Sequence, residues 1–156
     1  MTKWLTALAV LLASTACGQT VQLFDRDAES WAGHRYGERL PLREGTRLDA
    51  ILGQRQRLNP AVWSQGSLSN VGLWMAVPSA LVVDPTPVWI PQGVLDGLAT
   101  YSTRFALINA GERINARQAI YLTPTTPGTY TVRYIITARE LTAPVHGSFV
   151  IVVTAP

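Results

Sequence analysis

Residues 127–137 read PGTYTVRYIIT, and this stretch decides the fold class. It opens on a Pro-Gly turn signal, after which aromatic and β-branched residues occupy every second position: Tyr130, Val132, Tyr134 and Ile136. A period of two is typical of a strand with one buried face. Residues 148–154 (SFVIVVT) are apolar almost throughout, which predicts a second strand that is buried on both faces. The C-terminal part of the chain is therefore predicted to be mainly β.

Further short apolar runs lie between turn residues on the N-terminal side of this stretch. They cover residues 71–78, 81–84, 100–109 and 119–122. In the third of them, alternation predicts one face made of Tyr101, Thr103, Phe105 and Leu107. Short strands at this spacing, with turn signals between them, are typical of a β-sandwich.

The Gly128-Thr129-Tyr130 step resembles the penultimate strand of immunoglobulin-like sandwiches. In that family a tyrosine forms the tyrosine corner, in which its hydroxyl bonds back to nearby backbone. The resemblance covers residues 79–156 and implies an Ig-like β-sandwich with Greek key connections, in which Tyr130 is the corner tyrosine. Such a fold implies no particular function.

Residues 39–78 carry a second resemblance, to LysM modules. It rests on the order of three elements: residues 44–51 (EGTRLDAI), 58–60 (LNP) and 71–78 (VGLWMAVP). LysM modules are small βααβ domains that bind the N-acetylglucosamine backbone of peptidoglycan or chitin. The resemblance implies a small α+β segment.

Within that segment, Thr46 is expected to cap a helix whose apolar face carries Leu48, Ile51 and Leu52. Thr46, Asn59 and Trp63 are the residues expected to contact a glycan or a partner. The alternative is an irregular segment, whose residues are early strands and loops of the following β domain.

The beginning of the chain has the three parts of a secretory signal peptide. Lys3 precedes an apolar run over residues 4–13, and small residues follow at 14–16. The run is too short for a transmembrane helix, which needs roughly 20 residues. We expect residues 1–16 to be removed on export.

Cys17 is the only cysteine, so no disulfide can form within the chain. Ala16-Cys17-Gly18 resembles the lipobox of bacterial lipoproteins, whose cysteine receives a diacylglyceryl group. The resemblance implies that Cys17 is lipidated, that residues 17–38 are a tether, and that the protein is anchored on a membrane of the cell envelope. The alternative is ordinary cleavage after Ala16, which would give a periplasmic or secreted soluble protein.

The sequence lacks the motifs that are typical of several kinds of binding and catalysis. The arginines are scattered singly apart from Arg55 and Arg57, so we expect no nucleic-acid partner. The sequence has no Gly-x-Ser-x-Gly elbow, no phosphate-binding glycine loop and no set of zinc ligands at the usual spacing. We therefore expect no catalytic residues, no cofactor and no metal site, and the protein is predicted not to be an enzyme.

Residues 127–153 also resemble the end of CopC-type periplasmic copper-binding domains, which are Ig-like. The Asp-Gly-His motif of that family is absent from the last predicted hairpin, where His146 stands at a displaced position. The other histidine is His34. Metal binding of this type is kept as an alternative function.

Five tryptophans are present, of which Trp4 lies in the predicted signal peptide. Tryptophan in a small β domain is more often core than surface, so we expect two of the remaining four to be buried, Trp74 and Trp89. Taken together, the sequence predicts a non-enzymatic lipoprotein that acts as a binding or structural module. Its expected partners are the membrane, through the lipid, and peptidoglycan or another envelope protein.

Overall fold

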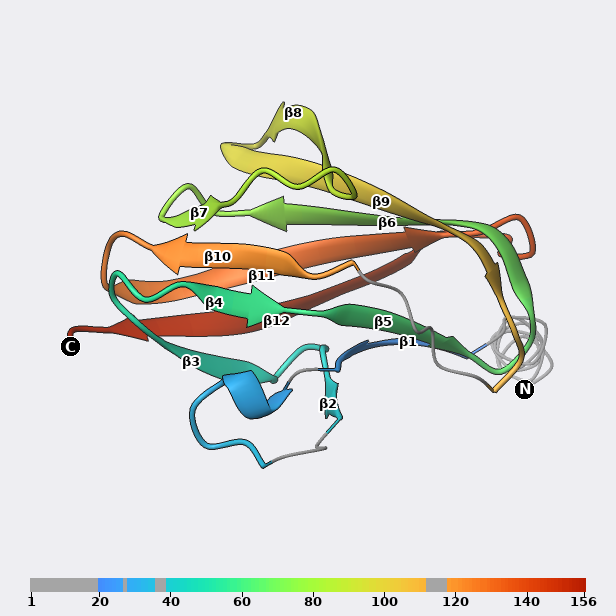
Figure 1. Ribbon diagram of the computed structural model, residues 1–156. Coiled ribbons are helices and arrows are strands. Elements are labelled where there is room, and N and C mark those ends of the chain that lie inside the picture. Colours follow the sequence, from blue (N-terminus) through green and yellow to red (C-terminus); the bar gives the residue numbers. More distant parts are fainter. Residues whose placement is uncertain (1–19, 27, 36–38, 112–117) are drawn as a thin grey trace, which may run out of the picture.

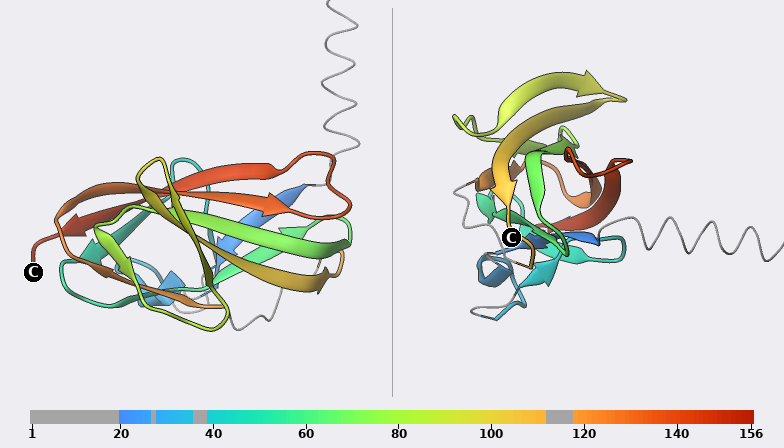
Figure 2. Two further views of the ribbon diagram at one scale, coloured as in Figure 1. Left: turned by 90° about the horizontal axis from the view of Figure 1, so that it is seen from above. Right: turned by 90° about the vertical axis from the view of Figure 1, so that its right-hand side faces the viewer.

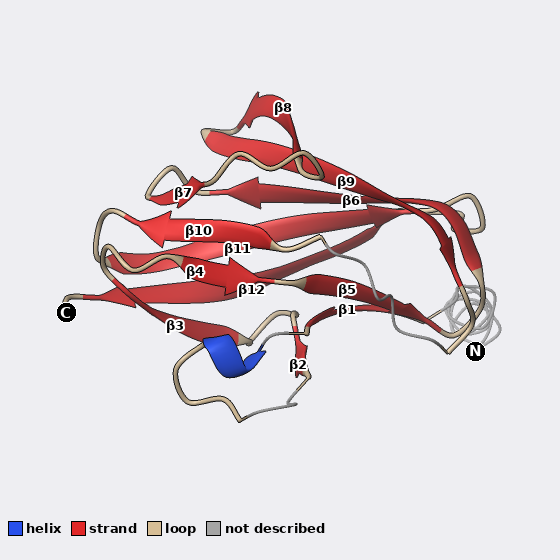
Figure 3. Cartoon of the chain, in the orientation of Figure 1, coloured by secondary structure: helices blue, strands red, loops and turns tan. Residues whose placement is uncertain are grey.

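The computed structural model describes residues 20–156 except residue 27, residues 36–38 and residues 112–117. The chain is mainly β, as predicted (Figures 1 and 3). Its strands are β1 (Val21–Asp25), β2 (Leu40–Pro41), β3 (Arg47–Ile51), β4 (Gln56–Leu58), β5 (Pro60–Ser64), β6 (Leu68–Val77), β7 (Leu81–Val83), β8 (Ile90–Leu95), β9 (Leu98–Ile108), β10 (Ile120–Pro124), β11 (Gly128–Thr137) and β12 (Val145–Thr154). A short 3-10 turn covers Ala28–Ser30. The predicted signal peptide and Cys17 lie outside the described residues.

The strands form one large sheet and two small ones. The large sheet has the order β3-β12-β11-β6-β9-β8, and the small sheets have the orders β2-β1-β5 and β4-β10-β7. Only Asn59 separates β4 from β5, so these two strands connect the small sheets almost continuously. The small sheets lie across one face of the large sheet (Figures 1 and 2). This layering is consistent with a β-sandwich.

The predicted alternation in β11 is confirmed, since Val132, Tyr134 and Ile136 are buried and their neighbours are more exposed. The prediction that the last strand is buried on both faces is wrong. In β12, Val150 and Val152 are only half-buried, whereas the odd-numbered residues between Phe149 and Val153 face the core. The reason is that the small sheets cover only one face of the large sheet.

In β9 the predicted face is correct only in part. Thr103 and Phe105 are buried, but Leu107 is exposed and Ile108 is buried in its place. Near the end of this strand, the positions that face the core therefore change from odd-numbered to even-numbered residues.

The helix predicted at residues 48–52 is wrong, because these residues belong to strand β3 and its end. β3 pairs parallel to β12, and Leu48 and Ala50 point into the core with a period of two. The Thr46 hydroxyl donates to the Pro41 carbonyl oxygen at 2.8 Å instead of capping a helix. Pairing with β12 gives the backbone N–H and C=O groups of β3 the hydrogen bonds that a helix would have formed within itself.

The segment 39–78, all of which is described, contains no helix and does not form the expected βααβ unit. Its strands pair with strands from the rest of the chain: β3 with β12, β4 with β10, β5 with β1, and β6 with β9 and β11. One cluster of buried side chains joins both halves, and it includes Leu48, Leu73, Trp89 and Phe149. The predicted division at residues 78 and 79 does not separate two cores, which agrees with the alternative that these are early strands of the β domain.

The tether predicted over residues 17–38 is wrong for its described central part. β1 pairs with β5 and β2, and the side chains of Leu23 and Trp31 are fully buried. No helix in the described part of the chain is long and apolar enough to cross a membrane.

Candidate binding groove on the outer face of the large sheet

The outer face of the large sheet carries two rows of side chains that cross several strands. Residues directly opposite each other in paired strands share a face. One row runs from Ser102 through Trp74 and Ile135 to His146, and the next runs from Thr100 through Ala76 and Arg133 to Ser148. The residues between them in sequence, such as Met75 and Tyr134, are buried in the core.

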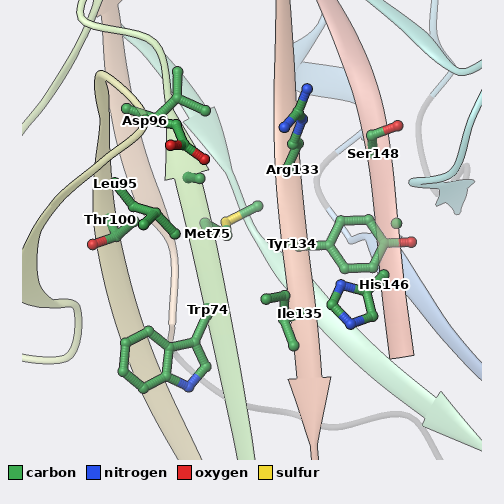
Figure 4. Close-up of a pocket in the computed structure, with 13 residues that line it drawn as sticks. Trp74, Met75, Leu95, Asp96, Thr100, Arg133, Tyr134, Ile135, His146 and Ser148 are labelled. Atoms are coloured by element: carbon green, nitrogen blue, oxygen red, sulfur yellow. The ribbon is translucent and has the colours of Figure 1, made fainter. Parts of the chain in front are cut away.

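The β8–β9 hairpin rises beside these rows and forms one wall (Figure 1, top). Its two-residue turn is Asp96-Gly97, with φ of 51° and 75°. Positive φ at both central residues is the geometry of a type I′ turn, for which Asp-Gly is a preferred sequence. This turn places Leu95 and Asp96 beside the sheet face, where they line the same hollow as Trp74 and Arg133 (Figure 4).

The rows and the hairpin border an open hollow of about 470 Å³. Its walls are mostly apolar, from Trp74, Ile135, Leu95 and Leu98, and Arg133 supplies a cation. Within the described part of the chain, no hydrogen bond or ion pair engages the side chains of Arg133 or His146. The hollow therefore combines an apolar surface with polar groups that remain available.

A second hollow of about 340 Å³ lies on the other side of Trp74. Polar side chains and Arg104 line it. They are held in place: Gln92 Nε2 donates to Ser102 Oγ at 2.9 Å, Gln118 Nε2 donates to the Arg104 carbonyl at 2.8 Å, and the Arg104 guanidinium donates to Asn70 Oδ1 at 2.8 Å. The Trp74 side chain borders both hollows and is 39% exposed. We call the two hollows and Trp74 together the outer groove.

The sheet beneath the outer groove is held by a close aromatic contact. The Tyr134 ring covers Gly147, where an added Cβ would lie 2.2 Å from Cζ of the ring. The Tyr134 hydroxyl donates to the Leu42 carbonyl oxygen at 2.5 Å, and burial raises the pKa of this tyrosine. Gly147 lies between His146 and Ser148, so this contact fixes the part of β12 that lines the groove.

The three predicted glycan-contact residues do not line either hollow. Trp63 donates from Nε1 to the Gly111 carbonyl at 3.3 Å, and the backbone N–H of Asn59 donates to Asp25 Oδ1 at 3.2 Å. Thr46 is bonded to Pro41, as described above. The side chains of Thr46 and Trp63 and the backbone of Asn59 therefore each have a structural partner outside the two hollows.

Tyr130, the predicted corner tyrosine, donates its hydroxyl to the Thr126 carbonyl at 2.7 Å. Its hydroxyl is also 3.2 Å from the Pro127 carbonyl oxygen. The two bonds connect the start of β11 to the loop before it.

The number of buried tryptophans was predicted correctly, but one of the two was misidentified. Trp31 and Trp89 are each 1% exposed, whereas Trp74 is on the surface. Trp74 points outward because its neighbours Leu73 and Met75 take the inward positions of β6. The groove was not predicted, because Trp74 was expected in the core and the Asp96-Gly97 hairpin signal was not used.

The described residues include no group of three or more His, Cys, Asp or Glu side chains placed to hold a metal ion. His146 lines the outer groove, and His34 does not line either hollow.

No family model and no curated protein matches this chain. Among solved structures, a family 123 glycoside hydrolase from Clostridium perfringens is similar with a TM-score of 0.48 and 13% identity, over 88% of this chain and 28% of that one. The bacterial hydrophobin BslA is similar with a TM-score of 0.43 and 17% identity, over 68% of this chain and 85% of that one. The chain thus spans less than a third of the length of the hydrolase. Neither likeness bears on what this chain binds.

Proposed function

We propose that this chain is an exported, non-enzymatic binding module of the bacterial cell envelope, held on a membrane by a lipid on Cys17. It binds its partner in the outer groove. The observation that carries this proposal is Trp74, a large aromatic side chain exposed between two hollows in the middle of a sheet face. A concave, mostly apolar site with a few polar groups is the usual form of a binding site.

We also propose that the scaffold is an Ig-like Greek key. With β4 and β5 counted as one interrupted strand, the orders β1-β5/β4-β10-β7 and β12-β11-β6 match the two sheets of an immunoglobulin domain. The Tyr130 hydroxyl bond to Thr126 supports the same assignment.

The lipid anchor rests on the signal-peptide pattern and the lipobox resemblance. β1 begins at Val21, four residues after Cys17. Four residues span at most about 14 Å when fully extended. A lipid on Cys17 would therefore hold the domain close to the membrane surface instead of at the end of a long tether.

A binding role is favoured over catalysis because the polar groups in the groove are not paired with one another. His146 and Ser148 both line it, but no hydrogen bond joins their side chains in the described part of the chain. A nucleophile and its base need direct hydrogen-bond contact, at about 2.6–3.2 Å.

The anchor is tested by mass spectrometry of the mature N-terminus, with and without globomycin. The expected result is a diacylglyceryl-modified Cys17 and accumulation of the precursor with the drug. An unmodified cysteine would contradict the anchor and leave the soluble alternative.

The groove is tested by retention of the full-length exported protein on envelope fractions, comparing Trp74→Ala with Trp63→Ala. Trp63 is the matched control because it is a partly exposed tryptophan outside both hollows. We expect retention to fall only with Trp74→Ala. Loss with Trp63→Ala alone would instead favour the glycan contact that the sequence suggested for residues 39–78.

A further inference from the structure

Building on the proposed function, we infer that the ligand of the outer groove is a glycan chain that carries N-acetyl and carboxylate groups, with one sugar ring stacked on Trp74. Three features of the outer groove point to this ligand: an aromatic surface, its position between two hollows, and the chemistry of their walls.

The first observation is the aromatic surface. Trp74 lies in a row with Ile135 and Ser102 on the face of the large sheet opposite the two small sheets (Figure 2). Its indole N–H has no acceptor within the described part of the chain. An indole offers an apolar face and a polar edge. A sugar ring offers the same combination, with C–H groups on one face and hydroxyls at its rim.

The second observation is the extent of the site. The hollows of about 470 and 340 Å³ lie on either side of the indole, which borders both. Together they extend from β12 across β11, β6 and β9 to β8. A site that continues past its aromatic centre in both directions suits a chain of repeating units better than an isolated small molecule.

The third observation is the difference between the two hollows. The larger one combines Leu95, Leu98 and Ile135 with two charged groups, Asp96 on the hairpin turn and Arg133 on the sheet. The Arg133 guanidinium has no ion-pair partner among the described residues. The apolar wall suits the methyl group of an acetamido substituent. The guanidinium suits a carboxylate, with which it forms charge-assisted hydrogen bonds.

The smaller hollow offers amide and hydroxyl groups, from Gln92, Gln118 and Ser102, beside Arg104, whose guanidinium donates to Asn70 Oδ1. The amide and hydroxyl groups pair with the hydroxyls of a second sugar unit. A peptide that binds as an added strand pairs with a sheet edge through its backbone. The larger hollow instead lies on the sheet face, over β6, β11 and β12, none of which is an edge strand of the large sheet.

The probe is peptide-free peptidoglycan glycan strands, in which N-acetylglucosamine alternates with N-acetylmuramic acid, a sugar bearing a carboxylate. Binding to the full-length exported protein in detergent is measured by calorimetry. Neutral chitooligosaccharides, which have the acetamido groups alone, and polygalacturonate, which has carboxylates alone, are the comparison ligands. We expect the muramic-acid strands to bind best.

Two variants assign the contacts. Trp74→Ala should weaken binding of the strands about tenfold or more, because the stacking surface is lost. Arg133→Gln should weaken binding of the strands about tenfold and leave chitooligosaccharide binding unchanged. Trp63→Ala is the control and should change neither. Thermal unfolding of all variants checks that they fold.

Three results would overturn the inference: no binding of the strands, equal binding of polygalacturonate, or equal loss for both N-acetylated ligands with Arg133→Gln. If Trp74-dependent retention on envelope fractions persists after complete muramidase digestion, the glycan is excluded and the groove is retained. If Trp74→Ala changes no retention at all, the proposed function itself fails.

Discussion

The inner and outer faces of β6, β11 and β12 differ in what their side chains do. Inward residues such as Leu73, Ile136 and Phe149 are fully buried in the common core. Outward residues in the same strands, Trp74, Arg133 and His146, are exposed and border a groove. Adjacent positions in one strand thus serve stability and binding separately, and the division follows the two-residue period of the strand.

The largest expected effect separates two tryptophans. Trp89 is 1% exposed and donates from Nε1 to the Gln118 carbonyl at 2.6 Å. Trp89→Ala should lower the free energy of unfolding by about 3–5 kcal/mol, since it leaves a cavity and an unpaired carbonyl. Trp74→Ala should lower it by about 1 kcal/mol or less, because the side chain lies outside the core. Urea unfolding measures both, and equal losses would contradict the division between faces.

A smaller loss is expected where the two faces meet at Gly147. Gly147→Ala would place a Cβ 2.2 Å from the Tyr134 ring, which would have to move and break its bond to Leu42. We expect a loss of about 1–3 kcal/mol in the free energy of unfolding. Tyr134→Phe is the control, which removes only the hydroxyl bond and should cost about 1 kcal/mol. A Gly147→Ala protein as stable as the wild type would show that the ring does not limit this position.

The smallest effect concerns pH and lies outside both faces. Glu140 accepts hydrogen bonds from the Ser69 hydroxyl and backbone N–H, which lower the pKa of its carboxyl group. The folded pKa is then below the unfolded value, so this contribution to stability is present above the unfolded pKa and is lost as pH falls through the folded one. Thermal midpoints of wild type and Glu140→Gln should therefore differ slightly at pH 7 and converge in acid. A gap that stays constant down to low pH would show that the carboxylate is not the cause.

The sequence was sufficient where one periodicity was clear. In β11 the buried residues Val132 and Ile136 alternate with exposed ones, and the prediction was correct. In β3 the sequence RLDAI fits both periods, because Leu48 and Ile51 can share a helical face while Leu48 and Ala50 share a strand face. Pairing with β12, about one hundred residues later, decides between them.

The groove could not be read from the sequence in the same way. In β6 the odd-numbered and the even-numbered positions are both largely apolar. The pattern therefore did not show whether Trp74 or its neighbours face the core. The groove also depends on the position of the β8–β9 hairpin relative to β12, which is a tertiary property. The Asp96-Gly97 turn was a local signal that could have revealed the hairpin, though not the hollow beside it.

Nuclear magnetic resonance of the indole N–H groups tests the central claim most directly, because each tryptophan gives its own signal. The exported protein is titrated with peptide-free peptidoglycan strands. The account predicts a large shift for Trp74 and little change for the buried Trp31 and Trp89 or for Trp63. A shift confined to Trp63, or no shift of any indole under conditions where the protein is retained on envelope fractions, would contradict it.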